Sequence, residues 1–272
     1  MANLRKWGMN HVRLGVMWEA VENLMGTYDQ EYLDQVENLI NKLGEYGIYT
    51  MVDAHQDVMA RMTCGEGMPD FYARQVINVG KPKCNGKDGK PGKWLGDAYK
   101  PVKEIFGDCR SIKDLKYEVD ARGWPKISEC NKEAFFKYYT LSEVQGIFDA
   151  LYTNKHDLTD AFVDYWDEVA KRFANNPYVI GFDPINEPFP ADIGADPTLL
   201  DPGVFCKKKL GPLYEKVFER YKIHNPNTIM YFEPGQFPDS YLGIVNEAGF
   251  EKPPGGEINS LNHVFNDHSY CC

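Results

Sequence analysis

The sequence predicts an α/β protein built on a parallel β-sheet, and three observations support this. Five short segments rich in apolar and β-branched residues recur along the chain, amphipathic helical patterns separate them, and polar residues follow each segment at one end. Buried parallel strands are apolar runs of this kind, and repeated strand–helix order is typical of α/β folds. Polar residues gathered beyond strand ends indicate the catalytic face of a (β/α)8 barrel. The five segments are 11–16, 48–54, 178–184, 228–234 and 262–270.

Composition sets broad limits on function. The 272 residues are 43% hydrophobic and 26% charged, which is ordinary for a globular protein of one large domain or two small ones. A formal net charge of -10 with no basic stripe argues against nucleic acid as a partner. No apolar run approaches the roughly 20 residues of a membrane span. Residues 1–16 lack the apolar core of a signal peptide.

Three helical patterns lie between the expected strands, over residues 28–47, 158–173 and 210–224. In the first pattern Gly47 marks the end. Apolar residues at helical spacing should face the sheet in the first two patterns. They are Leu33, Val36, Leu39, Ile40 and Leu43 in the first, and Leu158, Phe162, Tyr165, Trp166, Val169 and Phe173 in the second.

A long insertion interrupts the β/α rhythm at residues 58–155. Three of the four steps between expected strand ends are about 35 to 49 residues, the length of a β/α unit, whereas the second is about 130. The extra roughly 90 residues follow a strand and precede a helix, so they form a βα loop on the catalytic face. The insertion is rich in Gly, Pro, Lys and aromatic residues.

Seven cysteines suggest disulfide bonds. Their spacings do not match paired zinc-ligand motifs, so we expect disulfides in the insertion, with the pairing left open. Disulfides imply a secreted, lumenal or lysosomal protein, and reduced cytosolic thiols are the alternative. Four cysteines lie in the insertion, at Cys64, Cys84, Cys109 and Cys130, and the others are Cys206, Cys271 and Cys272.

Polar residues follow all five expected strands. Because side chains alternate along an extended segment, Asp53, His55 and Asp57 should share one face, and His268 and Tyr270 should share another. Structural interpretations remain open: Asp53 as a strand-end cap, His55 as a buried hydrogen-bonding group, Trp18 and Tyr270 as core. The full set is Trp18, Glu19, Asp53, His55, Asp57, Asn186, Glu187, Glu233, Asp267, His268 and Tyr270.

Glu187 is the strongest single candidate for chemistry. It ends an apolar strand and lies between Pro184 and Pro188. A carboxyl group buried there needs hydrogen-bond partners, or burial raises its pKa, and a raised pKa suits a general acid. A metal is not expected, because His55-x-Asp57 is not a two-histidine pair and the other donors occur singly. No cofactor is expected either.

The stretch INEPF, residues 185–189, resembles the acid/base motif of a large clan of retaining glycosidases built on (β/α)8 barrels. VRLGVMWEAVE (12–22) is similar to the second strand of that clan, DAHQD (53–57) to the third and DHSY (267–270) to the sixth. The run DAHQDVMARMTCGEGMPDFYA (53–73) narrows the resemblance to glycoside hydrolase family 5, in its endoglycoceramidase-like branch. The resemblance extends over nearly the whole chain.

This resemblance implies retaining hydrolysis of the β-glucosidic bond between glycan and ceramide in glycosphingolipids, carried out by two carboxyl groups. Glu187 is then the general acid and later the base, Asn186 binds the sugar 2-hydroxyl, and Arg13 supports the nucleophile. The remaining assignments concern the sugar subsite. His55 and Asp57 hold the sugar with Asp53 beside them, His268 and Tyr270 line the subsite, and Trp18 and Glu233 are site-lining candidates.

By the same resemblance, the five expected strands correspond to strands two to six of the eight strands in the family's barrel. We therefore expect residues 1–272 to be a single incomplete barrel domain, with strand one before Met1 and strands seven and eight, and any C-terminal β-sandwich, after Cys272. The family places its nucleophilic Glu on strand seven, so the nucleophile is expected to be absent and the fragment inactive. Glu233 ends the strand next to that of Glu187, whereas a retaining nucleophile lies about 5 Å across the pocket.

Two other functions stay open at this point. One is a β-glucanase, β-glucosidase or mannanase of the same family acting on polysaccharide. The other is a non-catalytic carbohydrate- or lipid-binding pseudo-enzyme. A lipid substrate also implies a transient contact with a membrane surface and an apolar channel beside the sugar site. Aromatic residues of the insertion are candidates to line this channel, among them Phe71, Tyr72, Phe135 and Phe136.

Overall fold

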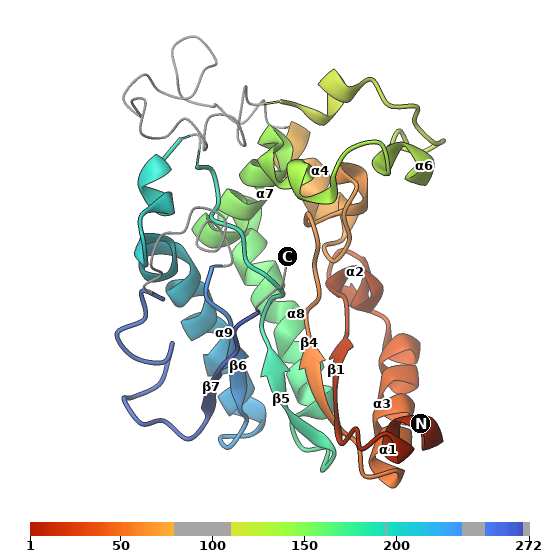
Figure 1. Ribbon diagram of the computed structural model, residues 1–272, viewed down its shortest axis with the longest axis vertical. Helices are drawn as coiled ribbons and strands as arrows, with labels where there is room; N and C mark the ends of the chain where they lie inside the picture. The colour runs from red at the N-terminus through yellow and green to blue at the C-terminus, as the bar shows by residue number, and fades with distance from the viewer. Residues whose placement is uncertain (79–109, 194, 236–247, 269–272) are drawn as a thin grey trace.

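The computed structural model describes residues 1–78, 110–193, 195–235 and 248–268 (Figure 1). Five parallel strands form one sheet in the order β1-β4-β5-β6-β7. All five predicted strands are present, in chain order, which confirms the predicted α/β architecture. They are β1 (His11–Gly15), β4 (Tyr49–Asp53), β5 (Val179–Asp183), β6 (Met230–Phe232) and β7 (His263–Phe265).

Helices α3 (Gln30–Glu45), α8 (Leu158–Phe173) and α9 (Gly211–His224) pack side by side against the sheet (Figure 1). All six predicted apolar positions of α8 are buried. In α3 four of five are buried, and the prediction was wrong for Leu39, which is 37% exposed because it lies at the margin of the apolar stripe. Short elements precede these helices: α1 (Ala2–Lys6), α2 (Trp18–Val21), and a hairpin of β2 (Glu22–Leu24) and β3 (Thr27–Tyr28).

The strand register aligns three strand ends. Gly15 pairs with Asp53, and Asp53 pairs with Asp183, so β1, β4 and β5 finish at the same level. Buried polar groups of the helices fix this level: the Trp166 indole donates to the Pro184 carbonyl at 3.0 Å and the Tyr214 hydroxyl to the Glu233 carbonyl at 3.1 Å. The backbone that carries the polar residues is therefore tied to the helical layer.

The predicted insertion is more ordered than a loop. It contains α4 (Asp70–Asn78), α6 (Ile127–Cys130) and α7 (Ser142–Thr153) among its described residues. Helix α7 packs on α8 and α4, and Ile147 and Phe148 are completely buried. Part of the segment that was predicted as a βα loop is thus core. Tyr72 and Tyr138 are also buried, whereas Phe135 and Phe136 are 50% and 40% exposed.

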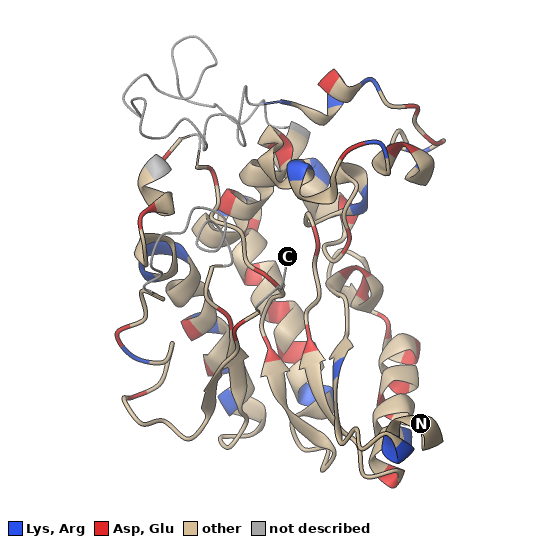
Figure 2. Ribbon diagram, in the orientation of Figure 1, with Lys and Arg blue, Asp and Glu red and all other residues tan. Residues whose placement is uncertain are grey.

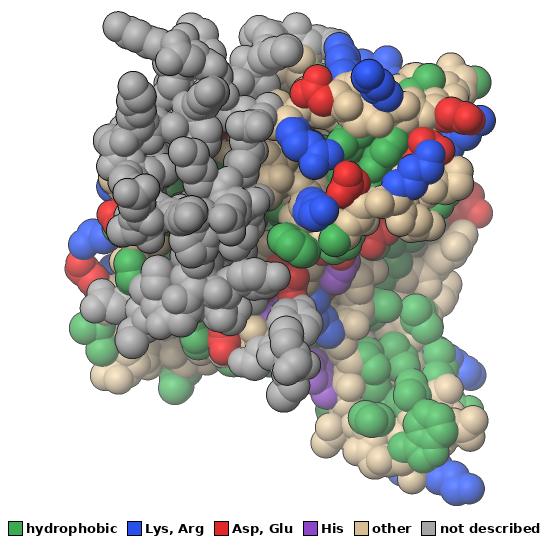
Figure 3. Space-filling model, turned by 45° about the horizontal axis from the view of Figure 1, so that its top comes forward, with side chains coloured by type: hydrophobic (Ala, Val, Ile, Leu, Met, Phe, Trp, Pro, Cys, Tyr) green, Lys and Arg blue, Asp and Glu red, His purple; other side chains and the backbone are tan. Residues whose placement is uncertain are grey.

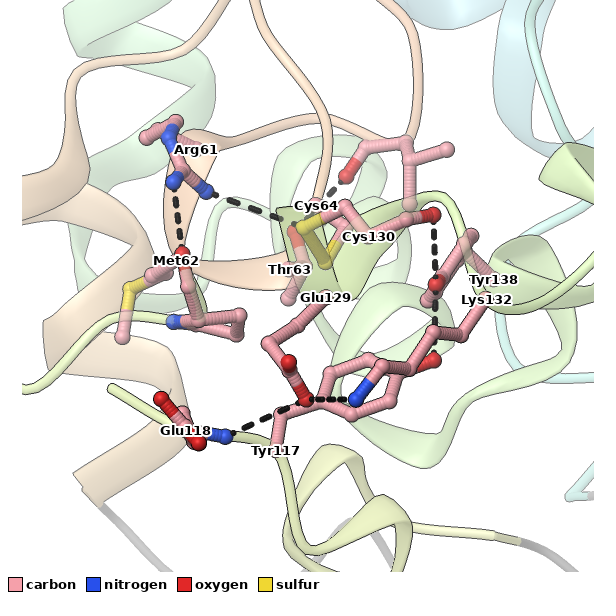
Figure 4. The surroundings of a disulfide bond; sticks show 12 residues. Arg61, Met62, Thr63, Cys64, Tyr117, Glu118, Glu129, Cys130, Lys132 and Tyr138 are labelled. Carbon is pink, nitrogen blue, oxygen red and sulfur yellow. Dashed lines mark hydrogen bonds and ion pairs between the residues drawn. A yellow bond between two sulfur atoms is a disulfide. The ribbon is translucent and has the colours of Figure 1, made fainter. Parts of the chain in front are cut away.

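A disulfide joins Cys64 to Cys130 across the insertion (Figure 4). The bond links the turn after β4 to α6, and its ends are 66 residues apart. The Tyr138 hydroxyl donates to the Cys130 carbonyl at 2.8 Å, and Arg61 donates to the Pro125 carbonyl at 2.5 Å. The predicted disulfide is confirmed for this pair. Cys84, Cys109, Cys271 and Cys272 lie outside the described residues, and Cys206 is a buried thiol.

Strands β1 and β7 are the outer strands of the five-stranded sheet in the described part of the chain. Val264 and Phe265 of β7 are 38% and 48% exposed, and Trp7 and Met9, just before β1, are 67% and 52% exposed. Among the described residues no helix has the length and apolar character needed to cross a bilayer.

Candidate active site

The polar residues predicted from the strand ends gather at one end of the sheet. Figure 2 shows acidic positions at the ends of β4 and β5 beside a basic position in β1. Figure 3, turned to bring the upper end forward, shows histidine side chains next to acidic and basic ones near the centre of this face. This end is the carboxyl end of a parallel sheet, where α/β barrels place their active sites.

Arg13 of β1 is the hub of the site. Its Nη2 donates to Asp53 Oδ1 at 3.0 Å, Asp183 Oδ2 at 2.8 Å and Glu233 Oε1 at 3.0 Å, and its Nε donates to Asp183 Oδ2 at 3.0 Å. The three carboxyl groups are at most 1% exposed. Burial alone would lower the pKa of Arg13, but Asp183, Asp53 and Glu233 together raise it. Arg13 is therefore a permanent cation that joins four strands.

His55 lies beside this hub, between two carboxylates. Its Nδ1 is 2.8 Å from Asp53 Oδ2, and its Nε2 is 3.4 Å from Asp57 Oδ2. The hydrogen bond with Asp53, followed by that with Asp57, raises the pKa of His55 to about 10, so the ring is cationic at neutral pH. The Tyr139 hydroxyl from the insertion donates to Asp57 Oδ1 at 3.1 Å. The predicted grouping of Asp53, His55 and Asp57 is thus present.

Glu187 and Glu233 share one histidine. His268 Nδ1 is 2.9 Å from Glu187 Oε1, and His268 Nε2 is 3.1 Å from Glu233 Oε1. The hydrogen bond with Glu187, then that with Glu233, raises the pKa of His268 to about 10. The Glu187 side chain is 22% exposed and that of Glu233 is 0% exposed. Of these two carboxyl groups, Glu187 is therefore the one that a bound molecule can reach.

The backbone of Glu187 is held in an uncommon conformation, with φ at +41°. Non-glycine residues adopt positive φ only where surrounding contacts compensate the strain, which is frequent at functional sites. Here the Glu187 N–H donates to Glu233 Oε2 at 2.8 Å, and Gln56 Nε2 donates to the carbonyls of Asn186 and Glu187 at 2.7 and 3.3 Å. Asn186 Nδ2 donates back to the Gln56 carbonyl at 2.9 Å. Glu233 and Gln56 thus aim the Glu187 side chain.

Trp18 lines a small cavity of about 20 Å³ together with His55, Gln56 and Ile185. Its indole donates to Glu22 Oε2 at 2.6 Å, and it is 3% exposed. Glu22 also accepts from the Tyr72 hydroxyl of α4 at 2.8 Å. Trp18 therefore packs in the core, as one of its two sequence interpretations has it, and its role in lining the sugar site stays a prediction.

The structure brings together nearly all predicted site residues: Arg13, Trp18, Asp53, His55, Asp57, Asn186, Glu187, Glu233 and His268. Tyr270 lies outside the described residues. Sequence reasoning missed Asp183, Asn266 and Gln56. Asp183 was treated only as the end of an apolar strand, although its position matches that of Asp53 in the neighbouring strand. Asn266 donates to Asp183 Oδ2 at 3.0 Å.

Two groups of donor atoms are close enough to hold a metal ion. They are His55, Asp57 and Glu66, and Asp183, Glu233 and His268, each with ligand atoms within 4.8 Å of one another. In the second group Arg13 already donates to both carboxyl groups. Its guanidinium therefore supplies the positive charge that a metal ion would supply between Asp183 and Glu233. The expectation that the site works without a metal stays a prediction.

In chemical terms, the site presents the partly exposed carboxyl group of Glu187 above a layer of buried charged residues. Glu187 is oriented by its own backbone contacts and by His268, and the buried carboxyl groups are committed to Arg13 and to the histidines. Such an arrangement can donate a proton to a bound molecule and take one back, which is general acid–base chemistry.

Comparisons with known proteins agree with this geometry. A family model described as Cellulase (glycosyl hydrolase family 5) matches residues 1–98 and 143–271. The chain is 32% identical to an endoglycoceramidase of Cyanea nozakii and 30% identical to one of Hydra vulgaris, each over 99% of this chain. It belongs to glycoside hydrolase family 5. Within the family, these relatives place it in the endoglycoceramidase-like branch.

Solved structures support the same fold. Endo-glycoceramidase II from Rhodococcus sp., in its ganglioside GM3 complex, superimposes with a TM-score of 0.66 at 23% identity, covering 99% of this chain and 51% of that one. The predicted (β/α)8-barrel class, with this chain carrying part of the barrel, is confirmed. The chain spans about half the length of the curated relatives it matches, 47% and 46% for those of Cyanea nozakii and Hydra vulgaris.

Proposed function

We propose that this chain carries the acid/base half of a retaining glycosidase that cleaves the β-glucosidic bond between glycan and ceramide. The observation that carries the proposal is Glu187, a partly exposed carboxyl group fixed by Glu233, Gln56 and His268. Glu187 protonates the leaving glycosidic oxygen and then removes a proton from the attacking water. Family membership supports this chemistry.

The nucleophile is a second carboxylate, and Glu233 does not suit that role. Glu233 is fully buried, and both of its oxygens accept hydrogen bonds: Oε1 from Arg13 and His268, and Oε2 from the Glu187 backbone. A nucleophile needs an oxygen that can reach the sugar carbon, so Glu233 acts as a support. We propose that the nucleophile is a glutamate outside residues 1–272, placed across the pocket from Glu187.

The sugar is bound by the residues around Glu187. Asn186 contacts the 2-hydroxyl, and the cationic His55 with Asp57 holds the hydroxyls of the sugar next to the cleaved bond, with Tyr270 completing the subsite. Arg13 stabilises the ionised nucleophile through charge. Support for a glycolipid substrate comes from the endoglycoceramidases to which this chain is similar and from the neighbouring structure that contains ganglioside GM3.

The lipid substrate reaches the enzyme at an anionic membrane surface that the outer side of the insertion contacts. We call residues 110–141 the insertion face; it carries exposed Val119, Ile127 and Phe135, which are 53%, 72% and 50% exposed. Lys113 and Lys116 on the same face form no ion pair within the described part of the chain. Figure 3 shows basic side chains on this side of the molecule, interspersed with acidic ones. Apolar side chains between lysines suit the interface of a bilayer, where each lysine contributes about 1 kcal/mol.

A vesicle sedimentation assay tests the membrane contact with the complete polypeptide that this gene encodes, called the full-length protein below. Binding to vesicles of phosphatidylcholine with phosphatidylserine should exceed binding to phosphatidylcholine alone. Binding should fall when Ile127 and Phe135 are both changed to Ser. Equal binding by this variant, or by Lys113→Glu, would contradict the contact.

The protein works in a secreted, lumenal or lysosomal setting. The Cys64–Cys130 disulfide supports this proposal, because such bonds persist mainly in oxidising compartments. Expression in a eukaryotic cell, followed by immunoblotting of medium and organelle fractions, tests it. Accumulation of the full-length protein in the cytosol with free Cys64 and Cys130 thiols would contradict it.

Hydrolysis of fluorescent glycolipids tests the reaction. The full-length protein should release glycan or glucose from lactosylceramide or glucosylceramide, and residues 1–272 alone should release none. Cello-oligosaccharides and manno-oligosaccharides serve as competing substrates, and faster cleavage of these would assign the chain to the polysaccharide-cleaving members of the family. Sugar binding without hydrolysis of any substrate would identify a pseudo-enzyme. Activity of residues 1–272 that Glu233→Gln abolishes would overturn the assignment of Glu233.

A further inference from the structure

Asp183, at the end of β5, has a carboxyl group that the proposed reaction does not use. It is completely buried. Its Oδ2 accepts three hydrogen bonds, from Nε and Nη2 of Arg13 at 3.0 and 2.8 Å and from Asn266 Nδ2 at 3.0 Å. Its Oδ1 is buried too, yet makes no hydrogen bond within the described part of the chain. Oδ2 thus has all the hydrogen bonds that it can accept, whereas Oδ1 has none within the described residues.

The charges of the cluster do not balance if every carboxyl group is ionised. The cations are Arg13 and the two histidines, whose pKa values are both raised to about 10 by hydrogen bonds to carboxylates. If Glu187 carries the proton that a general acid donates, His268 still pairs with the buried carboxylate of Glu233 and stays a cation, so four carboxyl groups face three cations. An uncompensated charge in a buried cluster costs several kcal/mol, so one more proton would stabilise the cluster. The four carboxyl groups are those of Asp53, Asp57, Asp183 and Glu233.

Hydrogen bonding decides which group holds this proton, because a protonated oxygen donates and cannot face a donor. Asp53 accepts from Arg13 on one oxygen and from His55 on the other. Glu233 likewise accepts on both oxygens.

Asp57 accepts from Tyr139 on Oδ1, faces His55 with Oδ2, and is 25% exposed, so water can solvate its charge. Of the four groups, Asp183 is the one with a buried oxygen that accepts no hydrogen bond within the described residues.

The electrostatic surroundings of Asp183 agree with this assignment. Burial, and then the negative charges of Glu233 and Asp53, raise the pKa of Asp183 well above its usual value, although Arg13 opposes the shift. The groups that face it come from every neighbouring element: Arg13 from β1, Asp53 from β4, Glu233 after β6, Asn266 after β7, and the hydroxyls of Tyr214 and Tyr221 from α9. A buried O–H without a partner also costs less than a buried anionic oxygen without one.

We propose that Asp183 is a neutral carboxylic acid in the folded protein, and that its carbonyl oxygen positions Arg13 without cancelling the charge of the guanidinium. This rests on the proposed function, which gives Glu187 its proton and Arg13 its role beside the nucleophile. Asp53 and Glu233 still pair with Arg13, but a neutral Asp183 leaves more of its positive charge for the nucleophile. Asp183 is thus a positioning residue that acts through Arg13.

Thermal unfolding of the full-length protein from pH 4 to pH 8 tests the protonation state. A group whose folded-state pKa is raised binds more protons when folded, so its contribution to stability is present below about 3.8 and is lost as pH rises towards the folded-state pKa. Asp183→Asn removes this titration and keeps a neutral acceptor. The melting temperature of the wild type should therefore fall relative to that of Asp183→Asn as pH rises. A relative rise would show that Asp183 is ionised.

An infrared measurement at pH 7 gives an independent answer. The wild type should show the carbonyl band of a buried carboxylic acid that survives Glu187→Gln, which removes the acid group of Glu187 itself, and that disappears in Asp183→Asn. The band should persist in Asp149→Asn, a matched change at a carboxylate that pairs with Lys155 and Lys209 away from the cluster. Absence of the band from the wild type would overturn the proposal.

The positioning role is tested through activity. Asp183→Ala removes the acceptor for Arg13 and should lower kcat by about 10²-fold, the usual effect of a small misplacement in an active site. Asp183→Asn should restore most of this loss and keep the wild-type pH profile, and equal loss in both variants would contradict the role. If the wild type hydrolyses no glycoside, the proposed function fails, whereas the unfolding and infrared results still decide the state of Asp183. Those two results also decide if Asp183→Ala does not fold.

Discussion

At the scale of single residues, the site is an assembly of buried charges beneath the partly exposed carboxyl group of Glu187. Asp53, Asp183 and Glu233 are each completely or almost completely buried around Arg13, while Glu187 is 22% exposed. Paired charges of this kind cost much to bury and are costly to separate. The network is therefore a rigid support that orients the carboxyl group of Glu187.

Changing Glu187 to Gln should lower kcat by about 10²–10⁴-fold on a natural glycolipid, because general acid catalysis contributes that much. The loss should be much smaller on an aryl glucoside with a good leaving group, which needs little help from a proton. Steady-state kinetics of the full-length protein on both substrates measure this. An equal loss on both substrates would show that Glu187 does not act as the acid.

The two raised histidine pKa values predict how stability depends on pH. A histidine with a folded-state pKa of about 10 stabilises the fold fully below its unfolded value of about 6.5, and this contribution disappears as pH rises through 10. The melting temperature should fall between pH 7 and pH 10, and His268→Gln should show a smaller fall. His11→Gln, at the start of β1 and away from the cluster, is the control and should keep the wild-type slope. Identical slopes for all three proteins would contradict the assignment.

At the scale of elements, backbone packing between β5 and β6 limits what the site can tolerate. A Cβ atom on Gly181 would lie 2.4 Å from the Ile229 carbonyl oxygen and 2.7 Å from the Tyr231 ring. Gly181→Ala should therefore push β6 away from β5 and lower the free energy of unfolding by about 3 kcal/mol. At Gly15 the nearest atom to a new Cβ is 3.4 Å away, which is ordinary contact. Gly15→Ala serves as the matched control in thermal unfolding, and equal melting temperatures for the two variants would contradict the packing.

The disulfide has a separate effect at the same scale. The bond closes a long loop within the insertion. Its removal therefore increases the conformational entropy of the unfolded chain. Cys64→Ser combined with Cys130→Ser should lower the free energy of unfolding by about 2–4 kcal/mol. Urea unfolding with and without reductant measures it. Reductant should destabilise the double variant less than the wild type, and an equal response of the two proteins would contradict the role of the bond.

Secondary-structure elements were easier to predict from the sequence than the side-chain contacts between residues that are distant in the chain. All five strands and three long helices were predictable, because apolar periodicity and glycine positions are local signals. The role of α7 was not, because its apolar residues lie in a segment that also carries loop-like composition. Asp183 was missed for a different reason. Its hydrogen bonds with Arg13 depend on the register of four strands, and local sequence patterns do not predict strand register. His268 as the bridge between Glu187 and Glu233 was likewise visible only after folding.

At the scale of the whole molecule, the described sheet ends in two open edges. β1 and β7 are its outer strands, with exposed apolar side chains on and beside them. Unpaired edges with apolar surface promote association. Residues 1–272 expressed alone should therefore elute from size-exclusion chromatography as oligomers or aggregates, whereas the full-length protein should be well dispersed. A monodisperse, cooperatively unfolding monomer of residues 1–272 would contradict this.

The central claim is that Glu187 is the acid/base and that Glu233 is not the nucleophile. The most direct measurement is the stereochemistry of the product that Glu187→Ala and Glu233→Ala form from an activated aryl β-glucoside in the presence of azide. Without its base, a retaining enzyme still forms the glycosyl intermediate, which azide attacks from the face that water would use. Glu187→Ala in the full-length protein should therefore yield β-glycosyl azide, and Glu233→Ala should yield no glycosyl azide. An α-glycosyl azide from Glu233→Ala would identify Glu233 as the nucleophile and contradict the claim.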